Sequence, residues 1–189
     1  MQLLKEKILA EGQVIGNDIL KVDRFLNHQI DVNFLNMIGR EFHQRYKEEA
    51  VTKILTVEAS GIAIACITAQ YFNVPVVFAK KGQARNLDQQ TYTSQVYSFT
   101  RSTTYNIMVA KSYVTAEDRV LIIDDFLANG RAVMGLIDIT EQAGANLAGV
   151  GIVIEKGFQE GGALLRQAGV NLQSLAKIES MTTGKIIFA

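Results

Sequence analysis

Two adjacent carboxylates, Asp124 and Asp125, follow an apolar run and precede a turn of small residues, in the stretch VLIIDDFLANGRA at residues 120–132. Like charges side by side repel, and a carboxylate is costly to bury unless a partner compensates it. Two carboxylates accept hydrogen bonds from a vicinal diol, whereas the free amides and dipole of a helix beginning near Gly130 favour a phosphate. These residues together predict a pocket for a phosphorylated sugar.

Other chemistries for an acidic pair need partners elsewhere in the chain. A Walker-type nucleotide site needs G-x-x-x-x-G-K-[ST], but Gly184 and Lys185 lack the earlier glycine and the following hydroxyl. A dinucleotide site needs G-x-G-x-x-G after a strand, whereas Gly149 and Gly151 lie inside a predicted strand. A two-carboxylate metal site has no histidine close by in sequence. An exposed acidic turn without a function is the plain alternative.

The acidic pair is expected at the edge of a parallel sheet. Four segments are continuously apolar, as strands buried on both faces are, namely residues 53–57, 76–79, 119–123 and 147–154. Helices are predicted over residues 2–11, 31–46, 61–72, 132–143 and 162–168, and closing strands over 171–178 and 184–189. The pattern predicts an α/β fold with helices on both faces of the sheet and a ligand site beyond the carboxyl ends of the strands.

Length and charge restrict the class of protein. The 189 residues favour one domain, and 19 basic against 19 acidic residues argue against a nucleic-acid or membrane binder. Charged residues occupy positions 5–7, where a signal peptide needs its apolar core, and the apolar stretches are too short to span a bilayer, so we expect a cytoplasmic protein. The lone Cys66 excludes a disulfide framework, and we expect it to be a buried thiol.

The polar segment at residues 80–105 is long for a connection in a compact domain, which predicts a lid or binding loop. Part of it, with Val96, Tyr97 and Phe99, is expected to form a hairpin with residues 106–110.

Residues 120–132 resemble the ribose-phosphate-binding motif of the type I phosphoribosyltransferases, which is four apolar residues, two acids, two apolar residues and A-T-G-G-T or similar. VEASGIA from Val57 is placed like that family's diphosphate-binding turn, and VIEKGF from Val153 like its purine-contacting segment. The N-terminal ILKVDRFLNHQID and the C-terminal end are most similar to the xanthine phosphoribosyltransferases. The resemblance covers nearly the whole chain.

The resemblance implies a single domain over residues 1–189, with a type I phosphoribosyltransferase core, a small hood from residues 1–30 and 170–189, and a mobile lid at residues 80–105. It implies transfer of the 5-phosphoribosyl group from phosphoribosyl pyrophosphate (PRPP) to N9 of xanthine, with Mg²⁺, by a homodimer. Guanine or hypoxanthine as acceptor, a PRPP-sensing regulatory protein and an inactive sugar-phosphate-binding module are the alternatives.

The resemblance also implies a role for individual residues. Asp124 and Asp125 would bind the ribose hydroxyls and steady the positive charge of an oxocarbenium-like transition state. The 5-phosphate would be held by Ala128, Asn129, Gly130, Arg131 and Ala132. The diphosphate would be held by Ala59, Ser60 and Gly61, and neutralised by Lys80, Lys81 or Arg85. The xanthine would be held by Leu20, Asn27, Lys156 and Phe158.

The chain departs from the family pattern at four positions. Asn129 and Ala132 stand where threonines are usual in the phosphate loop, and Arg131 where a glycine is usual. Backbone amides, the Asn129 amide and the Arg131 charge would therefore hold the phosphate. Ala128 stands where the hypoxanthine-guanine enzymes place a third aspartate, so no side chain is assigned as general base. Xanthine, the more acidic oxopurine, needs less help from a base.

Overall fold

The computed structural model describes residues 1–82, 90–98 and 103–189. Its elements, in chain order, are α1 (Gln2–Glu11), β1 (Gln13–Ile15), β2 (Ile19–Lys21), the π-helical turn η1 (Asp23–Asn27), α2 (Val32–Tyr46), β3 (Lys53–Val57), α3 (Ser60–Phe72), β4 (Val76–Gly82), β5 (Thr91–Ser98), β6 (Thr103–Ala110), the 3-10 turn η3 (Lys111–Tyr113), β7 (Arg119–Leu127), α4 (Arg131–Gln142), β8 (Asn146–Lys156), α5 (Gly161–Gln167), β9 (Leu172–Thr182) and β10 (Lys185–Phe188).

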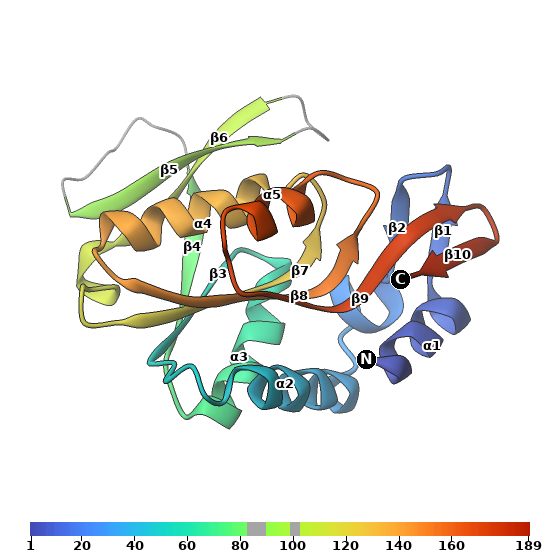
Figure 1. Cartoon of the computed structure of the whole chain (residues 1–189), viewed down its shortest axis with the longest axis horizontal. Helices are drawn as coiled ribbons and strands as arrows, with labels where there is room; N and C mark the ends of the chain where they lie inside the picture. The colour runs from blue at the N-terminus through green and yellow to red at the C-terminus, as the bar shows by residue number, and fades with distance from the viewer. Residues whose placement is uncertain (83–89, 99–102) are drawn as a thin grey trace.

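The predicted parallel sheet with helices on both faces is confirmed. The main sheet has the strand order β10-β9-β8-β7-β3-β4-β6-β5 over the described residues, and the five strands from β9 to β4 run parallel. The outer strands β10, β6 and β5 are antiparallel to their neighbours. Helices α2 and α3 lie on one side of this sheet and α4 and α5 on the other (Figure 1).

The central strands are buried as their continuous apolar runs predict. Every residue of β3 after the first is buried, as are all but three at the ends of β8. β4 is an exception, because the Phe78 side chain is 39% exposed and Ala79 is its one buried residue. The prediction that β4 is buried on both faces is therefore wrong. An apolar run of four residues does not distinguish a strand covered on both faces from one covered on a single face.

The polar segment at residues 80–105 is strand rather than loop over most of its described part. β4 continues to Gly82, with Lys81 paired to Ile107 of β6, and β5 pairs with β6 along its whole length. The expected long loop is therefore wrong for these residues. They lie at the sheet edge, where one face of the hairpin, with Val96, Ile107 and Val109, packs on the core and the other face can be polar.

The hairpin expected within this segment is confirmed, with a different register. Residues 106–110 pair with residues 91–95, and Val96 lies opposite Tyr105. Phe99 lies outside the described residues. The role of the segment as a lid stays a prediction.

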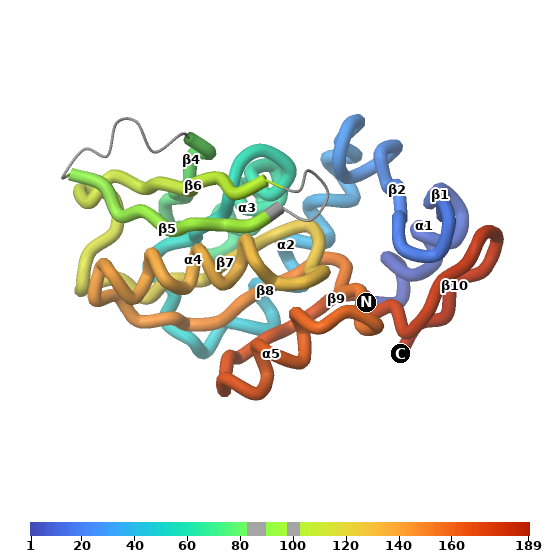
Figure 2. The backbone as a smooth tube through the Cα atoms, turned by 90° about the horizontal axis from the view of Figure 1, so that it is seen from above, coloured from blue at the N-terminus to red at the C-terminus, as the bar shows by residue number. Residues whose placement is uncertain are grey.

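The two ends of the chain lie side by side at one end of the molecule (Figures 1 and 2). α1 packs on β9, and Lys5 Nζ donates a hydrogen bond to the backbone oxygen of Ala189, 2.7 Å away. β1 and β2 form a separate two-stranded sheet in this region. The segments expected to form the hood are thus neighbours, although their role in covering a base stays a prediction.

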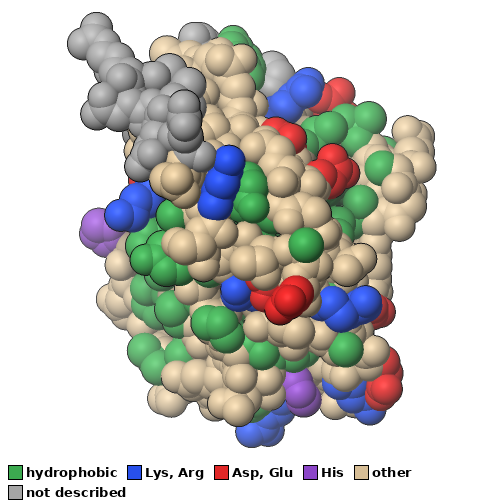
Figure 3. Space-filling view, turned by 90° about the vertical axis from the view of Figure 1, so that its left-hand side faces the viewer, with side chains coloured by type: hydrophobic (Ala, Val, Ile, Leu, Met, Phe, Trp, Pro, Cys, Tyr) green, Lys and Arg blue, Asp and Glu red, His purple; other side chains and the backbone are tan. Residues whose placement is uncertain are grey.

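The surface carries both signs of charge, as expected from equal numbers of basic and acidic residues. Basic and acidic side chains are interspersed on the face in Figure 3. Among the described helices, none is long and apolar enough to cross a membrane.

α2 is capped by Asp31, the first residue of the predicted helix, and ends in the buried Tyr46. The Asp31 carboxylate accepts a hydrogen bond from the Phe34 amide at 3.0 Å. At the other end, the Tyr46 hydroxyl donates to the Val150 carbonyl at 2.7 Å and accepts from the Gln173 amide at 3.1 Å. This hydroxyl joins α2 to β8 and β9, and burial raises its pKa above the usual value.

We predict that Tyr46→Phe lowers the free energy of unfolding by about 1–3 kcal/mol, because the buried backbone groups lose their partner. Tyr71→Phe is the matched control, since the Tyr71 hydroxyl bonds to Asn36 at the surface. Urea unfolding of both variants checks this. Equal stability of Tyr46→Phe and the unmodified chain would contradict the role of the hydroxyl.

Candidate active site

The acidic pair lies inside β7, near its carboxyl end. The predicted strand ended at residue 123, but β7 continues to Leu127 because Phe126 still pairs with Ile154 of β8. Asp124 and Asp125 are therefore buried, with exposed fractions of 5% and 8%. The Asp125 amide donates a hydrogen bond to Asp124 Oδ1 at 3.0 Å.

Two adjacent buried carboxylates are electrostatically unfavourable without a hydrogen-bond donor or a positive charge beside them. Burial, and then the neighbouring Asp125 charge, raise the pKa of the Asp124 carboxyl well above its usual value. The positive charge of Lys81 acts in the opposite direction and lowers this pKa. A ligand that brings hydroxyl donors, such as a ribose diol, would offset the cost of the buried charge.

The predicted phosphate turn connects β7 to α4. Gly130 is the N-cap of α4 and has the left-handed φ of +77°, which favours glycine. The turn packs tightly on the start of α5, because the Gly161 amide donates to the Ala128 carbonyl at 3.0 Å and a side chain on Gly130 would lie 3.1 Å from Gly161 Cα. The backbone of the turn is thus held in place at the N-terminus of a three-turn helix.

A pocket of about 230 Å³ opens at this turn. It is lined by all five residues predicted to hold the phosphate, Ala128, Asn129, Gly130, Arg131 and Ala132. The β5–β6 hairpin and Phe126 form part of its wall. Arg131 is paired with Glu160 at 3.5 Å, so its charge lies beside the pocket rather than deep within it.

The predicted diphosphate turn joins β3 to α3 and reaches the acidic pair. Ala59 is the N-cap of α3, Ser60 is its first residue, and the Glu58–Ala59 peptide bond is cis. Gly61 is buried, and a Cβ added there would lie 3.0 Å from Asp124 Oδ1. The turn and the acidic pair are therefore in direct proximity.

Lys81 lies next to this turn on β4. Its backbone amide donates to Glu58 Oε1 at 2.6 Å, and its ammonium lies 5.6 Å from the centre of the Tyr105 ring. The side chain is exposed. Of the other predicted neutralising residues, Lys80 is exposed on the same strand, and Arg85 lies outside the described residues.

Of the four predicted base-binding residues, two pack against the hood side of the site and two are exposed. Lys156, at the end of β8, donates to the backbone oxygen of Asp18 at 2.5 Å, and burial lowers the pKa of its ammonium. Leu20, two residues after Asp18, is buried on β2. Asn27 is exposed at the end of η1, and Phe158 is 40% exposed in the turn after β8. The base contacts of all four stay predictions.

The structure adds one aromatic residue that sequence reasoning missed. Phe126 lies 5.8 Å from Lys156 Nζ, measured to the ring centre, and also lines the pocket at the phosphate turn. It therefore bridges the two sides of the site. Its position directly after the acidic pair was a usable signal, but an apolar residue in an apolar strand is ordinarily part of the core.

The expectation of a buried Cys66 is wrong, because the residue is exposed on α3. The buried apolar residues of α3 are Ile64, Ala65 and Ala69, with Ala63, Ile67 and Phe72 partly buried against the same core. α3 is apolar on most of its surface, so its sequence does not show which side faces outward.

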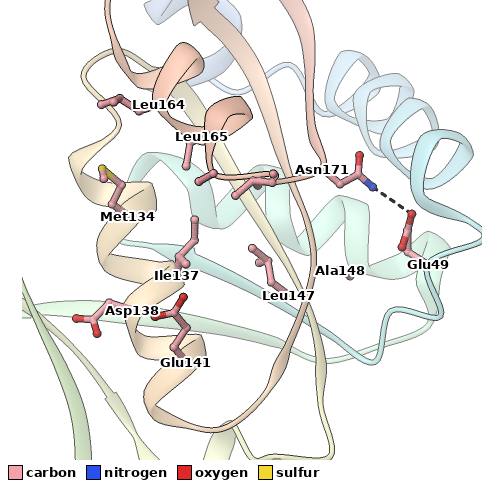
Figure 4. Close-up of a pocket in the computed structure, with 13 residues that line it drawn as sticks. Glu49, Met134, Ile137, Asp138, Glu141, Leu147, Ala148, Leu164, Leu165 and Asn171 are labelled. Carbon is pink, nitrogen blue, oxygen red and sulfur yellow. Dashed lines mark hydrogen bonds between the residues drawn. The ribbon is translucent and has the colours of Figure 1, made fainter.

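A larger pocket of about 600 Å³ lies away from the acidic pair, between α4, α5 and β8 (Figure 4). Met134 and Ile137 of α4 face Leu147 and Leu165 across it. The hydrogen bond between Asn171 and Glu49, at 3.1 Å, lies at one side. None of the predicted ligand-binding residues lines this pocket. Size alone therefore does not identify the site.

The arrangement of acidic pair, phosphate turn and diphosphate turn defines a class of protein, and comparison with known families agrees. Residues 26–163 match the model of the phosphoribosyl transferase domain. The chain therefore belongs to the phosphoribosyltransferase family.

Curated relatives of high identity are named for one substrate. The xanthine phosphoribosyltransferase of Clostridioides difficile (strain 630) is 62% identical over 189 residues, which cover the whole of both chains. The xanthine phosphoribosyltransferase of Ruminiclostridium cellulolyticum is 61% identical over 188 residues, which cover all of this chain and 99% of the relative.

Solved structures show the same fold at low identity. Adenine phosphoribosyltransferase from Giardia lamblia, complexed with 9-deazaadenine, is 21% identical with a TM-score of 0.77, over 92% of this chain and 97% of that one. The enzyme from Rhodothermus marinus is 20% identical with a TM-score of 0.75, over 94% and 99%. At these identities the likeness establishes the fold alone.

Next to Lys156, a buried carboxylate holds the end of β8 in place. Glu155 is 1% exposed and accepts two hydrogen bonds from Arg166, both at 2.7 Å, and one from Ser174 at 2.5 Å. Burial alone would raise the pKa of this carboxyl, but the bonds to Arg166 and Ser174 outweigh it and hold the pKa below its usual 4.5. The ion pair connects β8 to α5 and β9.

A carboxyl whose pKa is lowered by folding adds stability above its unfolded pKa and loses that contribution as the pH falls through the folded value. We therefore predict that Glu155→Gln reduces the free energy of unfolding at pH 7 by about 1–3 kcal/mol. The variant should also lose less stability than the unmodified chain as the pH falls below 4.5. Urea unfolding across this range, with the exposed Glu141→Gln as control, checks both; parallel pH profiles would contradict the assignment.

Proposed function

We propose that the chain acts in purine salvage and transfers the 5-phosphoribosyl group from PRPP to N9 of xanthine, giving xanthosine 5′-monophosphate and diphosphate. The observation that carries this proposal is the buried pair Asp124 and Asp125, flanked by the phosphate turn on one side and the diphosphate turn on the other. The relatives at 61% and 62% identity, named xanthine phosphoribosyltransferases, support xanthine as acceptor.

The proposed chemistry needs no protein nucleophile. The bond from C1 of the ribose to the diphosphate oxygen breaks, and its electron pair leaves with the diphosphate. The imidazole ring of xanthine gives up its proton to water, since no side chain is assigned as base, and the lone pair of N9 forms the new bond to C1. Positive charge that develops on the ribose in between is stabilised by the Asp124 and Asp125 carboxylates, which also accept hydrogen bonds from its hydroxyls. Lys81, next to the diphosphate turn, would offset the negative charge of the departing diphosphate.

Mg²⁺ would enter with the donor. No cluster of three or more potential metal-binding side chains occurs among residues 1–82, 90–98 and 103–189. Mg²⁺ keeps several waters and is commonly bound through substrate phosphates rather than a protein cage. We therefore propose that it is held by the diphosphate oxygens of PRPP. We further propose a homodimer located in the cytoplasm, on the resemblance to the family.

The choice of acceptor would depend on the hood side of the site. Lys156 would donate to the 6-oxo group of the purine, exchanging its bond to the Asp18 carbonyl for one to the base. Asn27 would donate to the 2-oxo group, and Leu20 would cover the ring. Guanine and hypoxanthine are the alternative acceptors, since both carry the same 6-oxo group.

The direct test is a spectrophotometric screen of xanthine, guanine, hypoxanthine and adenine with PRPP and Mg²⁺. Xanthine should give the highest kcat/KM.

In the same assay, Asp125→Ala should abolish transfer, because the ribose loses its hydrogen-bond acceptor. The thermal unfolding temperature of this variant should stay within a few degrees of that of the unmodified chain. Asp138→Ala, exposed on α4, is the matched control and should retain activity. Binding of PRPP without transfer to any purine would favour a sensor instead.

Asn27→Ala should raise KM for xanthine by about tenfold and leave hypoxanthine nearly unaffected, because hypoxanthine lacks the 2-oxo group. Steady-state kinetics with both bases measure the difference. An equal effect on the two bases would place the discrimination in other residues.

A further inference from the structure

Thr56 of β3 carries a polar group that the fold does not use. Its side chain is fully buried, and its hydroxyl Oγ1 has no hydrogen-bond partner. Leaving a buried hydroxyl unpaired destabilises the folded state, because the group loses its hydrogen bonds to water. Valine has the same shape and the same strand preference without this cost. A threonine here therefore calls for a reason other than packing.

The position of the hydroxyl points to the acidic pair. β3 and β7 are paired up to Leu55 and Ile122, so Thr56 lies one residue, and Asp124 two residues, beyond the last paired position. A Cβ on Gly61 would lie 2.1 Å from Thr56 Oγ1 and 3.0 Å from Asp124 Oδ1. The two oxygens thus border the same small space, which exists because residue 61 has no side chain.

The Asp124 carboxylate can accept further hydrogen bonds. An ionised carboxylate offers about four acceptor positions, of which the Asp125 amide occupies one on Oδ1. Among the described residues, the Asp125 charge raises the pKa of the Asp124 carboxyl and the Lys81 charge on β4 lowers it. The Thr56 hydroxyl is a neutral donor close to this carboxylate from β3.

We propose that Thr56 is a positioning residue, whose hydroxyl donates a hydrogen bond to the Asp124 carboxylate when the ribose of PRPP occupies the site. The inference rests on the function proposed above. In the ligand-free protein the carboxylate turns to the Asp125 amide. A bound diol draws the carboxylate into a new orientation, which the hydroxyl then holds.

This role explains why an unpaired hydroxyl is tolerated in the core. The unbound protein bears its cost, and the bond forms only in the complex, where it contributes to orienting the acceptor of the ribose hydroxyls. Local rules of stability are commonly broken at functional sites for this reason.

The experiment compares Thr56→Val, Thr56→Ser and Thr68→Val in the full chain. Thr68 of α3 is the matched control, because its hydroxyl is also fully buried and without a partner but is not near an assigned ligand-binding residue in the sequence. Both valine variants should unfold at the same temperature as the original or higher. Only Thr56→Val should lose kcat/KM for PRPP, by about tenfold, with KM for xanthine unchanged. Thr56→Ser, which keeps the hydroxyl, should retain most of the activity.

Three results would overturn the inference: normal kcat/KM in Thr56→Val, an equal loss in Thr56→Ser, or an equal loss in Thr68→Val. A purely structural role for Thr56 predicts a lower unfolding temperature for the valine variant, which the proposal excludes. Absence of transfer by the unmodified chain would overturn the proposed function and this inference together. Transfer by both the unmodified chain and Thr56→Val would overturn the inference alone.

Discussion

The burial of two adjacent carboxylates is the constraint around which the site is organised. Asp124 and Asp125 are held in the interior because β7 continues past them in its pairing with β8. Such a pair is costly without donors. The protein provides one backbone amide and the charge of Lys81, and the proposed function assigns the remaining acceptor positions to the hydroxyls of the ribose. Under that proposal the unbound state bears the cost of the buried pair, and the bound ligand offsets it.

Closely packed backbone segments surround the acidic pair. At Gly61 the first turn of α3 lies against Thr56 and Asp124 in a space that a methyl group would fill. At Gly130 the phosphate turn also lies close to Gly161 at the start of α5, since an added Cβ would lie 3.1 Å from Gly161 Cα. The N-termini of α3 and α4 therefore lie at the end of the sheet. Unpaired amides and helix dipoles there favour the anionic ends of the proposed donor, PRPP.

The errors of sequence reasoning share a physical origin. Residues 76–79 and the α3 run around Cys66 are apolar, but hydrophobicity does not reveal whether a second element covers each face. The polar residues 80–105 have little apolar character, yet their described part forms strands because an edge hairpin is stabilised by pairing with β4 and by α4. In each case the neighbouring elements, rather than local composition, decided burial and conformation.

The sequence by itself determined the parallel core and the site's local parts: the acidic pair, the turn at residues 128–132 and the turn at 59–61. Each is contiguous, so its chemistry depends on residues a few positions apart. Only the tertiary structure decided that Thr56 borders Asp124 and that Lys156 bonds to the Asp18 carbonyl. These contacts join residues 68 and 138 positions apart, and strand register and hood packing, which no local pattern encodes, bring them together.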